Sequence, residues 1–471
     1  MEYVSTRGNA PRLGFCDVLL TGLASDGGLY VPQAWPQLPP PWIREFAGKP
    51  YQEVALSVLT PFVGDEIERD VLAGMIQDAY SGFRHRAVAP LVQSGPNDWI
   101  LELFHGPTLA FKDVAMQLLA RLMDHVLAHR DQRATIVGAT SGDTGGAAIE
   151  AFRGRERTDV FILFPKGKVS PVQQRQMTTA EDPNVHAIAI EGNFDDCQAL
   201  VKAMFNHTGF REQVSLSGVN SINWARIMAQ IVYYFSSASN LGAPERTVSF
   251  CVPTGNFGNI FAGYAAKKMG LPLDRLVIAT NRNDILARTL ETGRYEATGV
   301  SPTISPSMDI QVSSNFERLI FEACGRDDQT VTQLMAGHSQ SGSFTLPSKC
   351  LEHIRTEFDA GRTGEAETVD EIGALLSDIG YIADPHTAVG SNVAANQQTG
   401  SPMITLSTAH PAKFPDAVEK ATGQRPALPK WSSEILEREE KYVTLSNELA
   451  VVEEYILENG RAAQWNTAVS S

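Results

Sequence analysis

The sequence predicts an α/β protein in which parallel sheets carry helices on both faces. From about residue 90 onward, short β-prone runs alternate with helical segments, as such sheets require. The runs lie at residues 134–137, 160–164, 185–190, 247–252, 275–280 and 403–406. Two of them lead into glycine-rich turns, and ligands of such sheets bind beyond the carboxyl ends of the strands. Residues 1 to about 88 lack the alternation and predict a mainly helical N-terminal region with a proline-rich loop at 31–41.

The composition excludes several classes of function. The 471 residues have room for two or three domains, and 43% hydrophobic and 20% charged residues are ordinary for a globular protein. A net charge of −15 argues against nucleic acid or an anionic membrane as a partner. The N-terminus lacks the apolar core of a signal peptide, and no run of about 18 apolar residues occurs. Five cysteines without C-x-x-C spacing favour free thiols over a disulfide framework, so we expect a cytoplasmic protein.

Lys112 is the first candidate catalytic residue. It follows Phe111 and stands directly before a predicted helix, residues 113 to about 129. The N-terminal end of a helix is electropositive, and burial beside Phe111 would further lower the pKa of the lysine. A neutral amine is the form that makes a Schiff base with an aldehyde cofactor. The alternative is a surface lysine whose aliphatic stem covers apolar neighbours.

The second candidate is the turn formed by Gly255, Asn256, Phe257, Gly258 and Asn259. It joins the strand-like run 247–252 to a helical stretch at 259–269. Glycines let the backbone approach a phosphate, and the helix N-terminus favours the anion. An ordinary tight turn between strand and helix is the alternative. The segment matches neither the dinucleotide-binding nor the P-loop pattern, so those two classes are poorly supported.

The third candidate is a hydroxyl-rich turn that follows the run 134–137. The hydroxyls of Thr140, Ser141 and Thr144, with nearby backbone N–H groups, could bind a small anion such as a carboxylate. Asp143 belongs to the same candidate substrate-binding segment. The alternative is that Asp143 or Thr144 simply caps the following helix.

A lysine amine, a phosphate cradle and a carboxylate nest together indicate pyridoxal phosphate (PLP) acting on an amino acid. The chain resembles the threonine synthase family, of the longer type with an added N-terminal region, among the fold-type-II PLP enzymes that include tryptophan synthase β and threonine dehydratase. Segments that carry the resemblance are 102–113, 139–145, 220–226, 255–259, 306–310, 313–316, 384–387 and 407–414, and residues 3–8 and 22–32 resemble the family's opening.

The resemblance implies an organisation of the chain. We expect an N-terminal domain at 1–88, a PLP-dependent catalytic region at 89–425 and a C-terminal helical segment at 426–471. Within the catalytic region, residues 131–220 would form the smaller of two lobes, each an open twisted parallel sheet, with PLP in the cleft between them.

The resemblance also implies roles for individual residues. Lys112 would carry PLP, and Thr408 would bond the pyridine nitrogen, although a hydroxyl at a strand end can equally satisfy local backbone. Ser221 and Arg226 would bind the phosphate of the substrate, for which the guanidinium fork is suited. His105, His386 and His410 have no metal-ligand spacing, so we expect them to be structural or to support residues of the site, and we predict no metal.

The implied reaction converts O-phospho-L-homoserine and water to L-threonine and phosphate, the last step of threonine biosynthesis. A related phospholyase that releases 2-oxobutanoate, ammonia and phosphate would share Lys112 and both anion sites. A non-catalytic PLP-binding protein is a third alternative, against which the joint presence of Lys112 and Arg226 argues. We expect a monomer, with a homodimer left open.

Overall fold

The computed structural model describes residues 1–140, 142–397 and 399–470. Its larger sheet has the order β13-β10-β9-β14-β4-β3, parallel except for the edge strand β3. The strands are β3 (Leu91–Gln93), β4 (Asp98–Glu102), β9 (Val248–Pro253), β10 (Leu273–Thr280), β13 (Phe358–Arg362) and β14 (Met403–Ser407). Every residue of β9 and β14 is buried, as expected of central strands covered on both faces.

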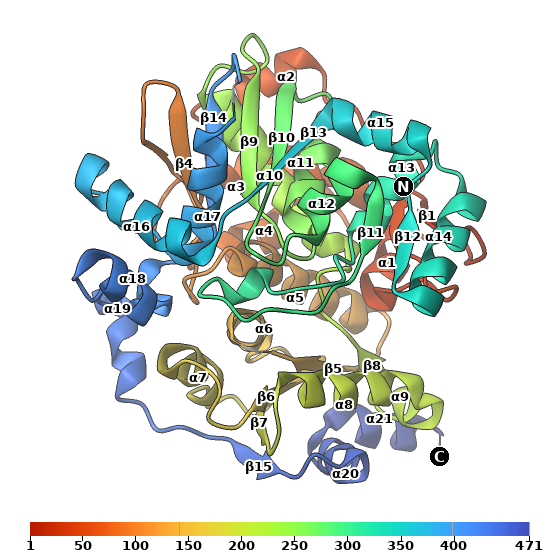
Figure 1. Ribbon diagram of the computed structural model, residues 1–471. Helices are drawn as coiled ribbons and strands as arrows, with labels where there is room; N and C mark the ends of the chain where they lie inside the picture. Colours follow the sequence, from red (N-terminus) through yellow and green to blue (C-terminus); the bar gives the residue numbers. More distant parts are fainter. Residues whose placement is uncertain (141, 398, 471) are drawn as a thin grey trace.

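The smaller sheet is wholly parallel and lies at the bottom of the view in Figure 1. Its order is β15-β7-β6-β5-β8, from β5 (Ala134–Ala139), β6 (Thr158–Pro165), β7 (Val185–Ile190), β8 (Leu216–Ser217) and β15 (Val443–Leu445). The two parallel sheets confirm the predicted fold class. Strand β15 is a difference, because 426–471 was expected to be helical throughout.

The C-terminal segment therefore completes the smaller lobe. In Figure 1 its blue ribbon runs from the side of the larger sheet down to β15 and the following helices. These helices are α20 (Leu449–Asn459) and α21 (Arg461–Ser470). Val452 and Ile456 are buried in the same apolar cluster as Phe161 and Ile188 of the smaller sheet. The strand was missed because three residues give no alternation that can be distinguished from a loop.

Two helices that pack against each other carry residues of the candidate site. They are α5 (Lys112–His129) and α10 (Trp224–Asn240), and α10 is buried along almost its whole length. An apolar surface on all sides is typical of a helix within a core rather than on its surface. Helix α10 packs against α5, α11 (Gly258–Lys268) and α3 (Tyr51–Val63).

The N-terminal region is mainly helical, as predicted, with a two-stranded sheet of β1 (Tyr3–Ser5) and β2 (Tyr30–Pro32). Asn223, just before α10, donates to the carbonyl of Leu19 at 2.9 Å. Arg318 donates to the carbonyl of Tyr30 at 3.0 Å and to that of Ile222 at 2.7 Å. The N-terminal region thus fixes the chain segment that contains Ser221 and Arg226.

The remaining helices cover the sheets and connect the strands. They are α1 (Phe15–Thr21), α2 (Pro40–Glu45), α4 (Arg69–Ser81), α6 (Asp143–Phe152), α7 (Pro171–Thr178), α8 (Phe194–Asn206), α9 (Thr208–Gln213), α12 (Ile285–Thr292), α13 (Phe316–Ala323), α14 (Asp328–Ser341), α15 (Ser348–Glu357), α16 (Glu365–Ile379), α17 (Pro385–Ala395), α18 (Pro415–Thr422) and α19 (Lys430–Ser433). A small sheet pairs β11 (Arg294–Glu296) with β12 (Ser343–Thr345). In the described part of the chain, no helix has the length and apolarity needed to span a membrane.

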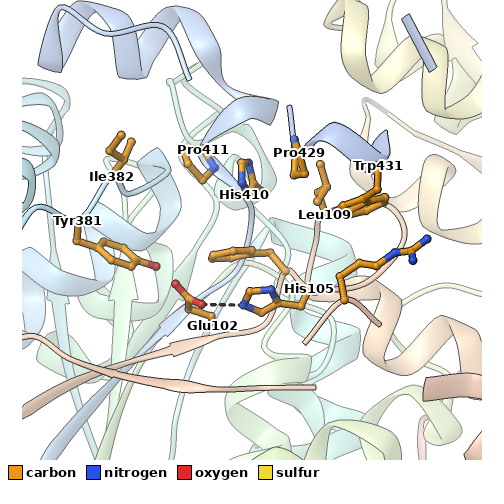
Figure 2. A pocket seen from close by; sticks show the side chains of 11 residues that line it. Glu102, His105, Leu109, Tyr381, Ile382, His410, Pro411, Pro429 and Trp431 are labelled. Carbon is orange, nitrogen blue, oxygen red and sulfur yellow. Dashed lines mark hydrogen bonds and ion pairs between the residues drawn. The ribbon is translucent and has the colours of Figure 1, made fainter. Parts of the chain in front are cut away.

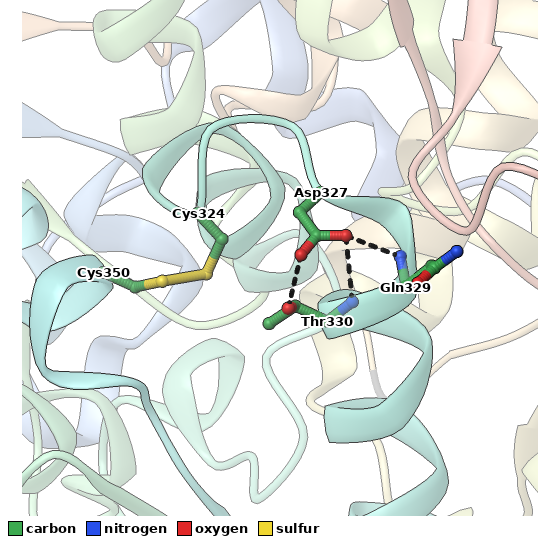
Figure 3. Close-up of a disulfide and its surroundings, with 5 residues drawn as sticks. All are labelled: Cys324, Asp327, Gln329, Thr330 and Cys350. Carbon is green, nitrogen blue, oxygen red and sulfur yellow. Dashed lines mark hydrogen bonds between the residues drawn. A yellow bond between two sulfur atoms is a disulfide. The ribbon is translucent and has the colours of Figure 1, made fainter.

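The cysteines differ from the prediction of free thiols. Cys324, at the end of α13, and Cys350, in α15, form a disulfide with Cα atoms 4.9 Å apart (Figure 3). Cys16, Cys197 and Cys251 are free, as predicted, and all three are buried. The pairing was missed because the two residues of the disulfide meet only through the packing of α13 against α15.

Candidate active site

Lys112 is the first residue of α5 and is 9% exposed. The segment before it runs beside the segment that follows β14, since the backbone N–H of Leu103 donates to the Ser407 carbonyl at 2.9 Å and that of Phe111 to the Thr408 carbonyl at 2.8 Å. Thr408 is also buried. The lysine and the strand-end hydroxyl are widely separated in sequence. Both therefore lie near the carboxyl ends of β4 and β14 in the larger sheet.

The Lys112 amine is held in conditions that favour its neutral form. Its Nζ lies 5.2 Å from the centre of the Phe111 ring and 3.6 Å from Oδ2 of Asp143. Burial lowers the pKa of Lys112, Asp143 opposes this effect, and the charges of Lys413 and Arg226 lower the pKa further. The direction agrees with the one expected from the sequence.

Asp143 contacts lysines instead of capping its helix. Its Oδ1 lies 2.8 Å from Nζ of Lys413 and accepts a 2.8 Å bond from the side-chain amide of Gln173. Burial alone would raise the pKa of Asp143, but Lys413 and Lys112 outweigh that effect and lower it. An ionised carboxylate repels a second carboxylate, so Asp143 fits a partner for the lysines better than a ligand for the substrate carboxylate.

Thr140 stabilises the turn before α6 through its hydroxyl oxygen. The Thr140 hydroxyl accepts from the N–H groups of Gly142 and Gly145 at 2.9 and 3.0 Å, which leaves its proton to donate elsewhere. Thr144 is partly buried in the first turn of α6. Ser141 lies outside the described residues. Thr140, not Asp143 or Thr144, therefore holds the turn at the start of this helix.

The glycine-rich turn between β9 and α11 is tightly built. A Cβ on Gly255 would lie 2.7 Å from the carbonyl oxygen of Ser307. Phe257, which precedes α11, has φ of 63°, a left-handed conformation that few residues with side chains adopt. Tyr233 and Tyr234 both donate to Oδ1 of Asn259, whereas its buried Nδ2 has no partner in the described part of the chain. A buried donor without an acceptor costs free energy, so a ligand oxygen at this turn would satisfy it.

Arg226 lies in the first turn of α10 and is 4% exposed. Its Nη1 donates to the carbonyl of Val219 at 3.0 Å, while its buried Nε has no hydrogen-bond partner among the described residues. Burial lowers the pKa of Arg226 to about 10, so the guanidinium stays charged at neutral pH. No salt bridge to a carboxylate is seen for it within the described chain, and an unpaired buried cation is suited to an anionic ligand.

Asn315 connects the two anion-binding candidates and was not singled out from the sequence. Its Nδ2 donates to the carbonyl of Ser221 at 3.1 Å and to that of Asn256 at 2.9 Å. The amide thus joins the segment of Ser221 and Arg226 to the glycine-rich turn. Its only indication in the sequence is that it lies in segment 313–316, which resembles the family. No local pattern predicts that its side chain joins two distant segments.

A cavity of about 400 Å³ lies beside the end of β4. Glu102, His105, Tyr381 and His410 are among its polar lining residues, and His105 lies 2.7 Å from the Glu102 carboxylate (Figure 2). Burial lowers the pKa of His410 to about 4, with His105 adding to the effect. Among the described residues, no group of histidine, cysteine and acidic side chains could hold a metal ion.

Comparison with known proteins identifies the family. Models described as "Threonine synthase N terminus", "Pyridoxal-phosphate dependent enzyme" and "Threonine synthase, C-terminal" match residues 2–80, 88–340 and 387–456. The chain is 52% identical to threonine synthase of Pseudomonas aeruginosa, over 98% of this chain and 99% of that protein. The chain belongs to the threonine synthase family.

Solved structures of the family agree with this assignment. A PLP-bound threonine synthase from Brucella melitensis is 63% identical, with a TM-score of 0.97 over 98% of this chain and 100% of that chain. Threonine synthase from yeast is 39% identical, with a TM-score of 0.92 over 97% and 98%. The fold-type-II architecture, the PLP cofactor and the assignment as a PLP-dependent lyase of threonine biosynthesis, all predicted from the sequence, are confirmed.

Proposed function

We propose that this chain converts O-phospho-L-homoserine and water to L-threonine and phosphate. The observation that carries the proposal is that an amine and a guanidinium, which can serve different parts of one substrate, are both buried in the same site. Lys112 offers an amine whose pKa is lowered by burial, and Arg226 offers a buried cation for which the described residues supply no carboxylate partner. An amino-acid substrate that also bears a phosphate needs both groups.

The residues present fit PLP. Gly255, Asn256, Phe257, Gly258 and Asn259 would hold its phosphate at the N-terminus of α11, and the unpartnered Nδ2 of Asn259 would supply a donor. Thr408 would bond the pyridine nitrogen, and a neutral hydroxyl there leaves that nitrogen largely unprotonated. When bound, PLP supplies an electron sink that acidifies successive carbons of the substrate.

Lys112 would move the protons of the reaction. Its Nζ would take the proton from Cα of the substrate and could return or remove protons at Cβ, since a released amine is a base that can serve both positions. Arg226 and Ser221 hold the phosphate that leaves from Cγ. Water then adds at Cβ, and the retained phosphate can act as an acid or base in that step. The buried setting limits access of water to the earlier steps.

Thr140, Ser141 and Thr144 would bind the substrate carboxylate, with Asp143 as counter-ion of the lysines. The hydroxyl proton of Thr140 is not committed to the turn, because that oxygen acts there as an acceptor. The lobe that carries this turn extends over residues 131–220 in the proposed division of the chain. We also propose a cytoplasmic location and a monomer, with a homodimer as the alternative.

Analysis of products tests the function. The purified protein, incubated with O-phospho-L-homoserine and PLP, is expected to release threonine and phosphate in equal amounts. Formation of 2-oxobutanoate and ammonia in place of threonine would assign the phospholyase reaction. Absence of turnover with retained PLP would assign the non-catalytic alternative.

A further inference from the structure

Asp143 bridges two lysines, and the two contacts differ. Lys413, which follows β14, has no exposed surface on its side chain and places Nζ 2.8 Å from Oδ1. Lys112, at the start of α5, places Nζ 3.6 Å from Oδ2. Lys413 also donates to the carbonyl of Thr108 at 2.7 Å. The carboxylate therefore makes a hydrogen-bonded ion pair with Lys413 and a looser contact with Lys112.

Charged groups reach Lys112 from three further elements. Asp143 from α6 favours its ammonium form, whereas Lys413 from the segment after β14 and Arg226 from α10 oppose that form. Lys413 itself lies near Asp113 and His410, whose pKa values respond to it. With Lys413 removed, Lys112 would have the Asp143 carboxylate to itself, and a buried lysine paired with one carboxylate is a stable ammonium.

We propose that Lys413 is a positioning residue. It forms the closer ion pair with the Asp143 carboxylate and thereby prevents the Lys112 amine from forming a tight ion pair with the same carboxylate. The proposal deepens the proposed function, since a free amine at Lys112 is what Schiff-base formation and proton transfer require. It also explains why Asp143 is buried, because its carboxylate neutralises Lys413, which would otherwise be a buried lysine without a counter-charge. The carboxylate further ties the smaller lobe, through α6, to the segment after β14.

Two substitutions that remove charges of opposite sign test the proposal. Lys413→Met removes a cation of similar length, and Asp143→Asn removes the anion while keeping the size of the side chain. The measurement is the pH midpoint of Lys112 acylation by a small anhydride in the full chain before PLP is added, resolved by peptide mass spectrometry.

The expected shifts have opposite signs. Lys413→Met should raise the Lys112 midpoint by on the order of one pH unit, and Asp143→Asn should lower it. Lys413→Arg, which keeps the charge, should restore the wild-type midpoint. An unchanged midpoint in Lys413→Met, or shifts of the same sign in both variants, would overturn the proposal. Should Lys413→Met fail to fold, a midpoint in Asp143→Asn that does not fall would still contradict it.

The labelling does not depend on turnover, so its failure can be distinguished from failure of the proposed function. If the pH midpoints of Lys112 acylation shift in opposite directions but the protein makes no threonine, the proposed role of Lys413 is supported and the proposed reaction is contradicted. Threonine formation with identical midpoints in all variants would keep the reaction and reject the role of Lys413.

Discussion

The backbone N–H of Phe111 donates to the carbonyl of Thr408 at 2.8 Å, which fixes the residue before Lys112 to the strand-end threonine. The bond belongs to a short antiparallel contact in which Ala110 also pairs with Ala409. Because backbone groups make these contacts, the separation of the two chain segments does not depend on the packing of the Lys112 and Thr408 side chains. A site that must hold one cofactor between two groups gains accuracy from such a connection.

Lys112→Ala should abolish turnover and the visible absorbance of bound PLP. Borohydride reduction of the wild-type protein with PLP, followed by peptide mapping, should place the label on Lys112, because the pKa of this lysine is lowered. Lys413 is the informative competitor, since it is buried beside the same carboxylate. A label on Lys413 would show that Lys413, and not Lys112, carries PLP. Lys49→Ala, at an exposed lysine, serves as the control.

Gly258→Ala should weaken retention of PLP more than it affects folding. A Cβ at this position would lie 3.3 Å from Cδ1 of Ile227 and 3.4 Å from Nδ2 of Asn315, contacts that small movements can relieve. Those movements would shift the start of α11, whose N–H groups are assigned to the cofactor phosphate. The dissociation constant of PLP, measured by spectroscopic titration, is expected to rise about tenfold, equal to about 1.4 kcal/mol.

The matched control for this glycine is Gly74→Ala in α4, where an added Cβ meets nothing within 4 Å. That variant should bind PLP as the wild type does and gain about 0.5–1 kcal/mol of stability from helix propensity. Equal PLP binding by the Gly258 and Gly74 variants would show that the phosphate is held elsewhere.

The sequence predicted those parts of the site that rest on local signals. Lys112 stands before a strongly periodic helix, and Gly258 lies in a strand–turn–helix pattern, so short segments suffice to indicate them. The contact between Asp143 and Lys413 could not be predicted, because it depends on how the smaller lobe packs against the end of β14. The same limit applies to Asn315, whose two acceptors come from distant segments.

Asp113 should make stability depend on pH between about 4 and 6. Its carboxylate accepts from the N–H and hydroxyl of Thr108 at 2.8 and 2.6 Å, yet burial raises its pKa to about 6. The unfolded chain, with an ordinary pKa of about 3.9, loses this proton at lower pH than the folded protein. The stability contributed by the protonated group is therefore full below about pH 4 and is lost as the pH rises through about 6.

The test compares the free energy of unfolding of the wild type and Asp113→Asn by urea titration over this range. The wild type minus variant difference should fall with rising pH, by at most about 1.4 kcal/mol per unit for one proton. Asp65→Asn, at an exposed carboxylate, serves as the control. Parallel curves for wild type and Asp113→Asn would show that Asp113 does not titrate in this window.

Arg226→Ala should raise the apparent KM for O-phospho-L-homoserine by about tenfold or more. The guanidinium is buried, charged and left with an unpartnered Nε, so the substrate phosphate can take up its free donors. A hydrogen bond to a charged group contributes about 1.5–3 kcal/mol, and about 1.4 kcal/mol corresponds to a tenfold change. PLP content should stay normal, because the cofactor phosphate is assigned to Gly255–259. Arg246→Ala, at an exposed arginine, should leave KM unchanged, whereas wild-type kinetics in Arg226→Ala would place the substrate phosphate elsewhere.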